Sequence, residues 1–166
     1  SNLRQFVLLP VFARQNYDNL ISSQVHMEQA AAESEFNTYF EGTDKSLGII
    51  ATGIAYNYLM ENFQQKKPEH PILKLCHYPL PHKHINRMLD ACDQVLVIED
   101  GYPMVEERLK GYQEKGTPIK GKLDGTLPRT GELNPNHVAD ALGISKSSSK
   151  PFTVCFVCAA LSFKVL

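Results

Sequence analysis

Short apolar runs alternate with amphipathic segments of helical length between Leu47 and Gly143, and this alternation restricts the fold more than any other feature of the chain. The runs that we interpret as strands are 47–52, 72–76, 94–98 and 119–123. The segments that we interpret as helices are 54–65, 82–92, 105–113 and 135–142. Strands that alternate with helices form parallel βαβ units with right-handed crossovers, which place helices on both faces of one sheet. We therefore predict an α/β fold with three layers, α/β/α, around a mostly parallel sheet of about five strands.

The last predicted helix, 135–142, has the clearest boundaries in the sequence. Asn134 is a favourable N-cap, Pro135 suits the first helical position, and Gly143 suits the residue after a helix. We expect this helix to close a domain of residues 47–143.

Two further segments flank this domain. Residues 1–46 are predicted to form an arm, with an apolar run at 6–9 that is either extended arm or edge strand, a helix at 17–32 and a short amphipathic turn at 36–40. Residues 144–166 begin as a Ser/Lys linker and continue into an apolar segment, which we assign to the start of another domain.

The charges of the chain are balanced, with 17 Lys and Arg against 18 Asp and Glu among 166 residues. Nucleic acids and anionic membranes require a basic surface, so we expect neither as the main partner. No apolar run reaches the length of a membrane span, and no signal peptide is recognisable at the start. Cys76 and Cys92 lie in apolar segments and are expected to be buried, reduced thiols, which is typical of a cytoplasmic protein.

An acidic turn, Glu99-Asp100-Gly101, follows directly on the third predicted strand. A carboxylate at the carboxyl end of a parallel strand can hold a ribose hydroxyl. It can equally lie in a solvated turn, or at the N-terminus of the next helix, where the helix dipole favours negative charge. A contact between domains through Glu99 is the remaining possibility.

The glycine-rich loop that begins at Gly121 contains Lys122, Asp124 and Arg129. These side chains could bind a phosphate or carboxylate ligand. Alternatively, pairing of Arg129 with Asp124 could simply order the loop.

Two other patterns are interpreted as chance or surface features. Residues 116–122 match the first seven positions of a phosphate-binding loop, but Leu123 stands where Ser or Thr should reach magnesium, and the match leads into a strand. His77, His82 and His84 lie close in sequence, but the last two point apart on a helix and have no acidic neighbour, so we expect surface histidines.

Cys155 and Cys158 form a CxxC pair, which in a cytoplasmic chain suggests a metal, iron–sulfur or redox site. The pair is incomplete as a cluster ligand set, because no further cysteines follow it here. No catalytic or cofactor-binding residue can be assigned from the sequence.

Four segments, taken in order, resemble the middle domain of the α subunit in the indolepyruvate:ferredoxin oxidoreductase family of 2-oxo acid:ferredoxin oxidoreductases. They are LGIIATGIAYNYLMENF (47–63), LKLCHYPLP (73–81), QVLVIEDGYPMVEERLK (94–110) and GKLDGTLPRTGELNP (121–135). The upstream segment VLLPVFARQNYDNL (7–20) is similar to the linker that leaves the first domain of that subunit.

This resemblance implies a large enzyme of which the chain is one part. Such enzymes decarboxylate aryl-2-oxo acids with thiamine diphosphate and magnesium, pass electrons through 4Fe-4S clusters to ferredoxin, and transfer the acyl group to CoA. They work with a β subunit. The region seen here resembles the transketolase C-terminal-type domain, which supports assembly and does not itself hold thiamine diphosphate. The resemblance therefore implies that this fragment is inactive alone, and that Glu99, Asp124 and Arg129 are candidates for contacts between domains.

The end of the chain, 151–158, resembles the start of the pyrophosphate-binding domain of the same enzymes. Cys155 and Cys158 match, but Phe156-Val157 replaces Pro-Gly and Ala159-Ala160 replaces Pro-His. No site residue can be transferred to that last position.

Two alternatives stay open at this point. The chain could be a stand-alone α/β module that binds a nucleotide, CoA or another protein. It could also be the same domain of a different thiamine-diphosphate enzyme, although the segment GKLDGTLPRTGEL favours the indolepyruvate branch.

Overall fold

A computed structural model describes residues 9–63, 66, 68–111 and 116–144. Its elements in chain order are α1 (Pro10–Ala32), β1 (Thr38–Phe40), β2 (Gly48–Thr52), α2 (Ala55–Asn62), β3 (Ile72–Leu75), α3 (His82–Ala91), β4 (Val95–Ile98), α4 (Met104–Lys110), β5 (Ile119–Lys120) and α5 (Pro135–Leu142).

The strands form one sheet of five in the order β1-β3-β2-β4-β5. Strands β2 to β5 are parallel, and β1 joins the edge antiparallel to β3. The chain first moves from β2 to β3 and then returns to the other side of β2 to form β4. In such doubly wound sheets, ligands bind outside the carboxyl ends of the strands where the direction changes, here β2 and β4. The predicted three-layer α/β fold is confirmed.

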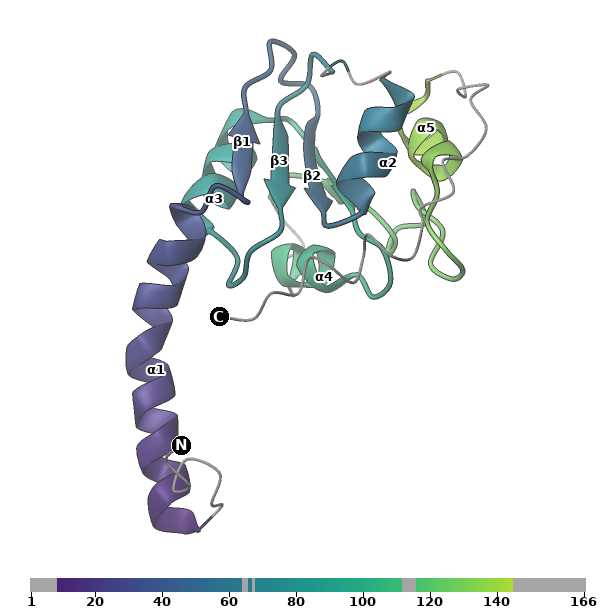
Figure 1. Ribbon diagram of the computed structural model, residues 1–166. Helices are drawn as coiled ribbons and strands as arrows, with labels where there is room; N and C mark the ends of the chain where they lie inside the picture. Colours follow the sequence, from purple (N-terminus) through teal and green to yellow (C-terminus); the bar gives the residue numbers. More distant parts are fainter. Residues whose placement is uncertain (1–8, 64–65, 67, 112–115, 145–166) are drawn as a thin grey trace.

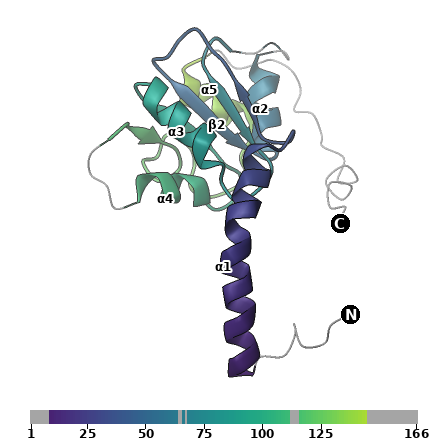
Figure 2. The same cartoon turned by 90° about the vertical axis from the view of Figure 1, so that its left-hand side faces the viewer.

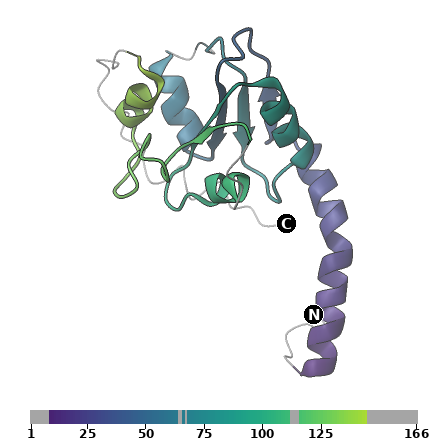
Figure 3. The ribbon, with the colours of Figure 1, turned by 180° about the vertical axis from the view of Figure 1, so that it is seen from behind.

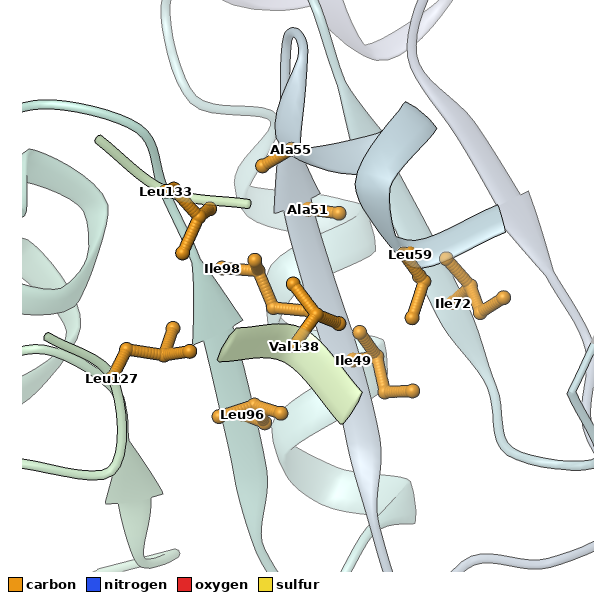
Figure 4. Close-up of a cluster of buried hydrophobic side chains, with 10 residues drawn as sticks. All are labelled: Ile49, Ala51, Ala55, Leu59, Ile72, Leu96, Ile98, Leu127, Leu133 and Val138. Atoms are coloured by element: carbon orange, nitrogen blue, oxygen red, sulfur yellow. The ribbon is translucent and has the colours of Figure 1, made fainter. Parts of the chain in front are cut away.

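Helices cover both faces of the sheet, α2 and α5 on one and α3 and α4 on the other (Figure 1; Figure 3). Strand residues alternate between the two faces, so Ile49 packs with α2 and α5 whereas Ile50 packs with α3 and α4. Figure 4 shows the first of these clusters, to which the loop before α5 adds Leu127 and Leu133.

Helix α5 has the capping that the sequence predicts. The Asn134 side chain accepts a hydrogen bond from the backbone N–H of His137 at 3.1 Å, and Gly143 adopts the left-handed conformation, φ 65°, that ends the helix.

Helix α1 extends away from the domain (Figure 1; Figure 2). It is 23 residues long and buries only Ala31, in its last turn. It begins earlier than predicted, at Pro10, because proline fits the first turn of a helix, where no backbone N–H is needed. Most of the apolar run 6–9 lies outside the described residues.

Three predictions were wrong in detail. Residues 38–40 form edge strand β1 rather than an amphipathic turn, so the sheet includes residues upstream of the expected domain start at Leu47. The fourth predicted strand ends at Lys120, because the backbone N–H groups of the next residues bond to side chains of Asp124 and Glu106. Cys76 is exposed because β3 ends one residue before it, whereas Cys92 is buried as expected.

Candidate functional site

The loops that follow the carboxyl ends of β2, β3, β4 and β5 hold most of the residues singled out in the sequence. Because these strands are parallel, their carboxyl ends meet at one edge of the sheet. We call this region the carboxyl edge and define it as residues 53–54, 76–81, 99–103 and 121–134.

Glu99 lies inside the domain rather than at its surface. Its side chain is 4% exposed, and its two carboxylate oxygens accept hydrogen bonds from the backbone N–H groups of Val105 and Glu106, each at 2.9 Å. The carboxylate therefore caps the N-terminus of α4, as one interpretation of the sequence proposed. Burial raises the pKa of Glu99, while the two backbone bonds and the charge of Lys122 act in the opposite direction.

Glu106 is a second buried carboxylate, 1% exposed, which sequence reasoning missed. It accepts hydrogen bonds from the backbone N–H groups of Lys122, at 2.6 Å, and Leu123, at 3.1 Å. The ammonium group of Lys110, one helical turn later, donates to it at 2.8 Å. In the sequence Glu106 resembles an ordinary surface glutamate paired with Lys110, and nothing there signals its burial. The loop after β5 is thus bound to α4 through its backbone.

Lys122 is the third buried charged residue of this region, after Glu99 and Glu106, and is only 3% exposed. Its Nζ donates to the backbone carbonyl oxygen of Gly101 at 2.6 Å, which joins the loop after β5 to the loop after β4. A buried ammonium group is tolerated where carboxylates lie nearby, and Glu99 is one of them. This lysine occupies the lysine position of the rejected phosphate-binding match, and its amine is used within the protein.

Asp124 and the core residues around it order the glycine-rich loop. Its Oδ1 accepts hydrogen bonds from the backbone N–H groups of Gly121, at 3.0 Å, and Thr126, at 3.1 Å. Partial burial would raise the pKa of Asp124, but these bonds outweigh it and the pKa is lowered. No ion pair between Asp124 and Arg129 occurs in the described part of the chain, so the expected Arg–Asp pairing does not order this loop. Leu127 anchors it in the core instead.

The carboxyl edge still presents exposed side chains of the types that are common in protein interfaces. Arg129, Tyr102 and Met104 are exposed. The Tyr102 hydroxyl donates to the carboxylate of Glu107, which raises the pKa of Tyr102, and the nearby charge of Arg129 acts in the opposite direction. We call these three residues the Tyr102–Arg129 surface. Tyrosine, methionine and arginine are enriched where proteins contact one another.

The three clustered histidines lie near the junction with α1. Nε2 of His84 lies 3.0 Å from the carbonyl oxygen of Ala32, and His82 lies 4.0 Å from Glu28. His77 and His82 are exposed, as expected, whereas His84 is half-buried. Across the described ranges, no group of three or more His, Cys, Asp or Glu residues could hold a metal ion. Cys155 and Cys158 lie outside those ranges.

The fold and its carboxyl edge define an α/β domain of the doubly wound class. Among curated proteins, the chain is similar to "Indolepyruvate oxidoreductase subunit IorA" of Methanothermobacter thermautotrophicus, with 34% identity over 143 residues, which is 83% of this chain and 23% of that protein. The protein of the same name from Archaeoglobus fulgidus is 34% identical over 148 residues, which is 85% of this chain and 23% of that protein. The protein of the same name from Methanothermobacter marburgensis is 32% identical over 147 residues, which is 86% of this chain and 24% of that protein.

The chain belongs to the family of indolepyruvate oxidoreductase subunit IorA. It spans about a quarter of the length of these relatives. No protein-family profile and no solved structure matches it. Over the described residues, no helix combines the length and apolar character that crossing a membrane requires.

Proposed function

We propose that this chain is the transketolase C-terminal-like domain of an indolepyruvate:ferredoxin oxidoreductase α subunit, and that it serves assembly rather than catalysis. The observation that carries the proposal is the internal use of the charged groups at the carboxyl edge. Glu99, Glu106 and Lys122 bond to backbone groups of their own domain, while Arg129 stands exposed on a loop that this network holds in place.

In this proposal the guanidinium group of Arg129 pairs with a carboxylate on another domain or on the β subunit. Such charge-assisted pairs are stronger than neutral hydrogen bonds, and the exposed Tyr102 and Met104 would add apolar contact area around the pair.

The complete enzyme, located in the cytoplasm, would convert aryl-2-oxo acids to acyl-CoA and reduce ferredoxin. In this proposal, other parts of that enzyme bind thiamine diphosphate, magnesium and the 4Fe-4S clusters, as the resemblance to the transketolase C-terminal-type domain implies. When bound there, thiamine diphosphate would supply the decarboxylation chemistry. The alternative of a free-standing nucleotide- or CoA-binding module is supported less well, since the Glu99 carboxylate that could hold a ribose is committed to α4.

The test uses the full-length parent subunit with its partner subunit, purified without oxygen. Reduction of ferredoxin or a viologen dye is followed with CoA and either indolepyruvate, phenylpyruvate or pyruvate. Reduction with the aryl substrates is expected. Turnover by the isolated 166 residues would contradict the assembly role, and absence of reduction with every substrate, in protein that contains thiamine diphosphate and clusters, would overturn the proposed reaction.

A further inference from the structure

Two side chains of the Tyr102–Arg129 surface come from different loops. Tyr102 belongs to the loop that follows β4, and Arg129 belongs to the loop that follows β5. A surface built from two loops presents one defined arrangement of side chains only when the loops hold a fixed position relative to each other. The contacts between these loops therefore determine what the surface can bind.

The segment that carries Arg129 is short and is anchored on both sides. Leu127 and Leu133 are 1% and 2% exposed and pack in the same buried cluster (Figure 4). The backbone N–H of Leu127 also donates to the carbonyl oxygen of Gly121 at 2.8 Å. Residues 129–132 lie between the two leucines and are exposed. Arg129 is thus carried on an exposed tip whose two ends are attached to the core.

Lys122 joins this loop to the loop that carries Tyr102. Its ammonium group donates to the carbonyl oxygen of Gly101 at 2.6 Å. That oxygen belongs to the peptide group between Gly101 and Tyr102, so the bond fixes the backbone immediately before the tyrosine. The backbone N–H of Lys122 is itself bonded to the carboxylate of Glu106 at 2.6 Å. The backbone of Lys122 is therefore held by α4 while its side chain holds the loop after β4.

A second contact between the two loops is longer. Oδ1 of Asp100 accepts a hydrogen bond from the backbone N–H of Leu133 at 3.4 Å, and the same oxygen accepts from the N–H of Gly101 at 3.0 Å. A bond of this length with a shared acceptor is weaker than a short bond from a charged donor. The bond from Lys122 is therefore the stronger of these two links.

A simpler role for Lys122 makes a different prediction. The lysine lies close enough to the buried carboxylate of Glu99 for their charges to interact. If Lys122 served only to neutralise Glu99, removing both charges would restore everything that the loss of Lys122 costs. The bond to Gly101, in contrast, is lost with the amine whatever the charge of Glu99. The two roles can therefore be separated by experiment.

We propose that Lys122 is a positioning residue, which holds Tyr102 and Arg129 in one binding surface by bonding the peptide group before Tyr102 to the loop that carries Arg129. The inference rests on the proposed assembly role of this surface. It adds that the affinity for the partner depends on a buried amine. Without the amine, each loop stays attached to the domain, the first through Glu99 and the second through its two buried leucines, but the loops no longer move together.

Hydrogen exchange of the 166-residue chain tests whether Lys122 joins the loops. Lys122→Met removes the amine and keeps an unbranched side chain. The N–H of Leu133, which donates to the other loop, should exchange about tenfold faster in this variant, while the amides of β2 keep their protection. Lys110→Met is the matched control, because Lys110 also donates to Glu106 but lies on α4. It should leave exchange at Leu133 unchanged.

A double variant covers the case in which Lys122→Met alone does not fold. Lys122→Met with Glu99→Gln removes both buried charges, so no uncompensated carboxylate remains at Glu99. The N–H of Leu133 should still exchange about tenfold faster in the double variant than in Glu99→Gln alone. Equal exchange in these two variants would overturn the proposal and leave Lys122 the role of neutralising Glu99.

Binding of the partner subunit to the complete α subunit tests the consequence for the surface. Arg129→Ala is expected to weaken binding about tenfold in the wild type and in Lys110→Met, but less than about twofold in Lys122→Met, where Arg129 no longer holds its place beside Tyr102. A tenfold effect that persists without Lys122 would overturn the positioning role. Absence of an effect in every background would instead contradict a contact between Arg129 and the partner subunit, and hydrogen exchange would then decide whether Lys122 joins the loops.

Discussion

Gly121 lies against the carboxylate of Glu106, so closely that a methyl group on Gly121 would overlap the carboxyl carbon and Oε2 and would press on Oε1. Glycine is needed here for space and not for an unusual backbone angle. This close approach lets one buried carboxylate receive the backbone N–H groups that follow β5.

Gly121→Ala should lower the free energy of unfolding by about 1–3 kcal/mol, because the added methyl group must displace the carboxylate or the loop. Urea unfolding of the isolated chain measures the effect. Thr130→Ala, at an exposed position of the same loop, is the control and should lie within about 0.5 kcal/mol of the wild type. An unchanged urea midpoint for Gly121→Ala would show that the loop can accommodate the methyl group, and would contradict this prediction.

Asn37 uses every hydrogen-bonding position of its amide. It donates to the carbonyl oxygens of Ala31 and His77, and it accepts from the backbone N–H groups of Cys76, at 2.8 Å, and His77, at 2.9 Å. Asn37→Ala removes the partner of these four backbone groups, which are buried or partly buried, and should cost about 2–4 kcal/mol. Hydrogen exchange in the last turn of α1 should accelerate as well. Asn37→Asp retains the acceptor but loses both donors, and we expect it to destabilise the protein too.

Stability should depend on pH through Glu99. Burial raises the pKa of this carboxyl above its ordinary value of 4.5, so the folded protein retains the proton to higher pH than the unfolded chain. The protonated Glu99 therefore makes its full contribution to stability below pH 4.5. This contribution is lost as the pH rises through the raised pKa of Glu99. Glu99→Gln cannot ionise, so the wild type should lose stability relative to this variant over that range. Urea unfolding at a series of pH values measures the difference, and a constant difference would contradict the assignment.

Asp124 should show the opposite dependence. The pKa of Asp124 is lowered below its ordinary value of 3.8. Its contribution to stability is therefore present above pH 3.8 and disappears as the pH falls through the lowered pKa. The difference between the wild type and Asp124→Asn should therefore shrink on acidification. If the difference in stability grows on acidification instead, the two backbone hydrogen bonds do not lower the pKa of Asp124.

Arg129→Ala should leave the isolated domain intact, with a stability change within about 0.5 kcal/mol, because the side chain is exposed. If the Tyr102–Arg129 surface contacts another domain or subunit, the same change should weaken binding of the partner subunit to the complete α subunit about tenfold. Lys83→Ala removes an equal charge from α3 and serves as the control. Unfolding of the isolated Arg129→Ala domain would instead indicate a role within the loop.

The sequence predicts the central sheet well, because β2 and β4 are continuous apolar runs between helices with clear periodicity. Strand β1 was missed since three residues are too few to show alternation, and its partner β3 is specified only by tertiary contact. Among the charged residues, Glu99 could be predicted as a helix cap from its place after a strand. The burial of Glu106 could not, because it depends on the loop from Gly121 folding back over α4.

Helix α1 and its attachment at Asn37 also form a lever. At 1.5 Å per residue its 23 residues extend about 35 Å, so a tilt of roughly 10° at the attachment moves the far end by about 6 Å. The contacts of Asn37 and His84 with the last turn of α1 thus set the positions of Tyr17 and Leu20 at some distance from the sheet, and a change too small to unfold the domain could still displace them.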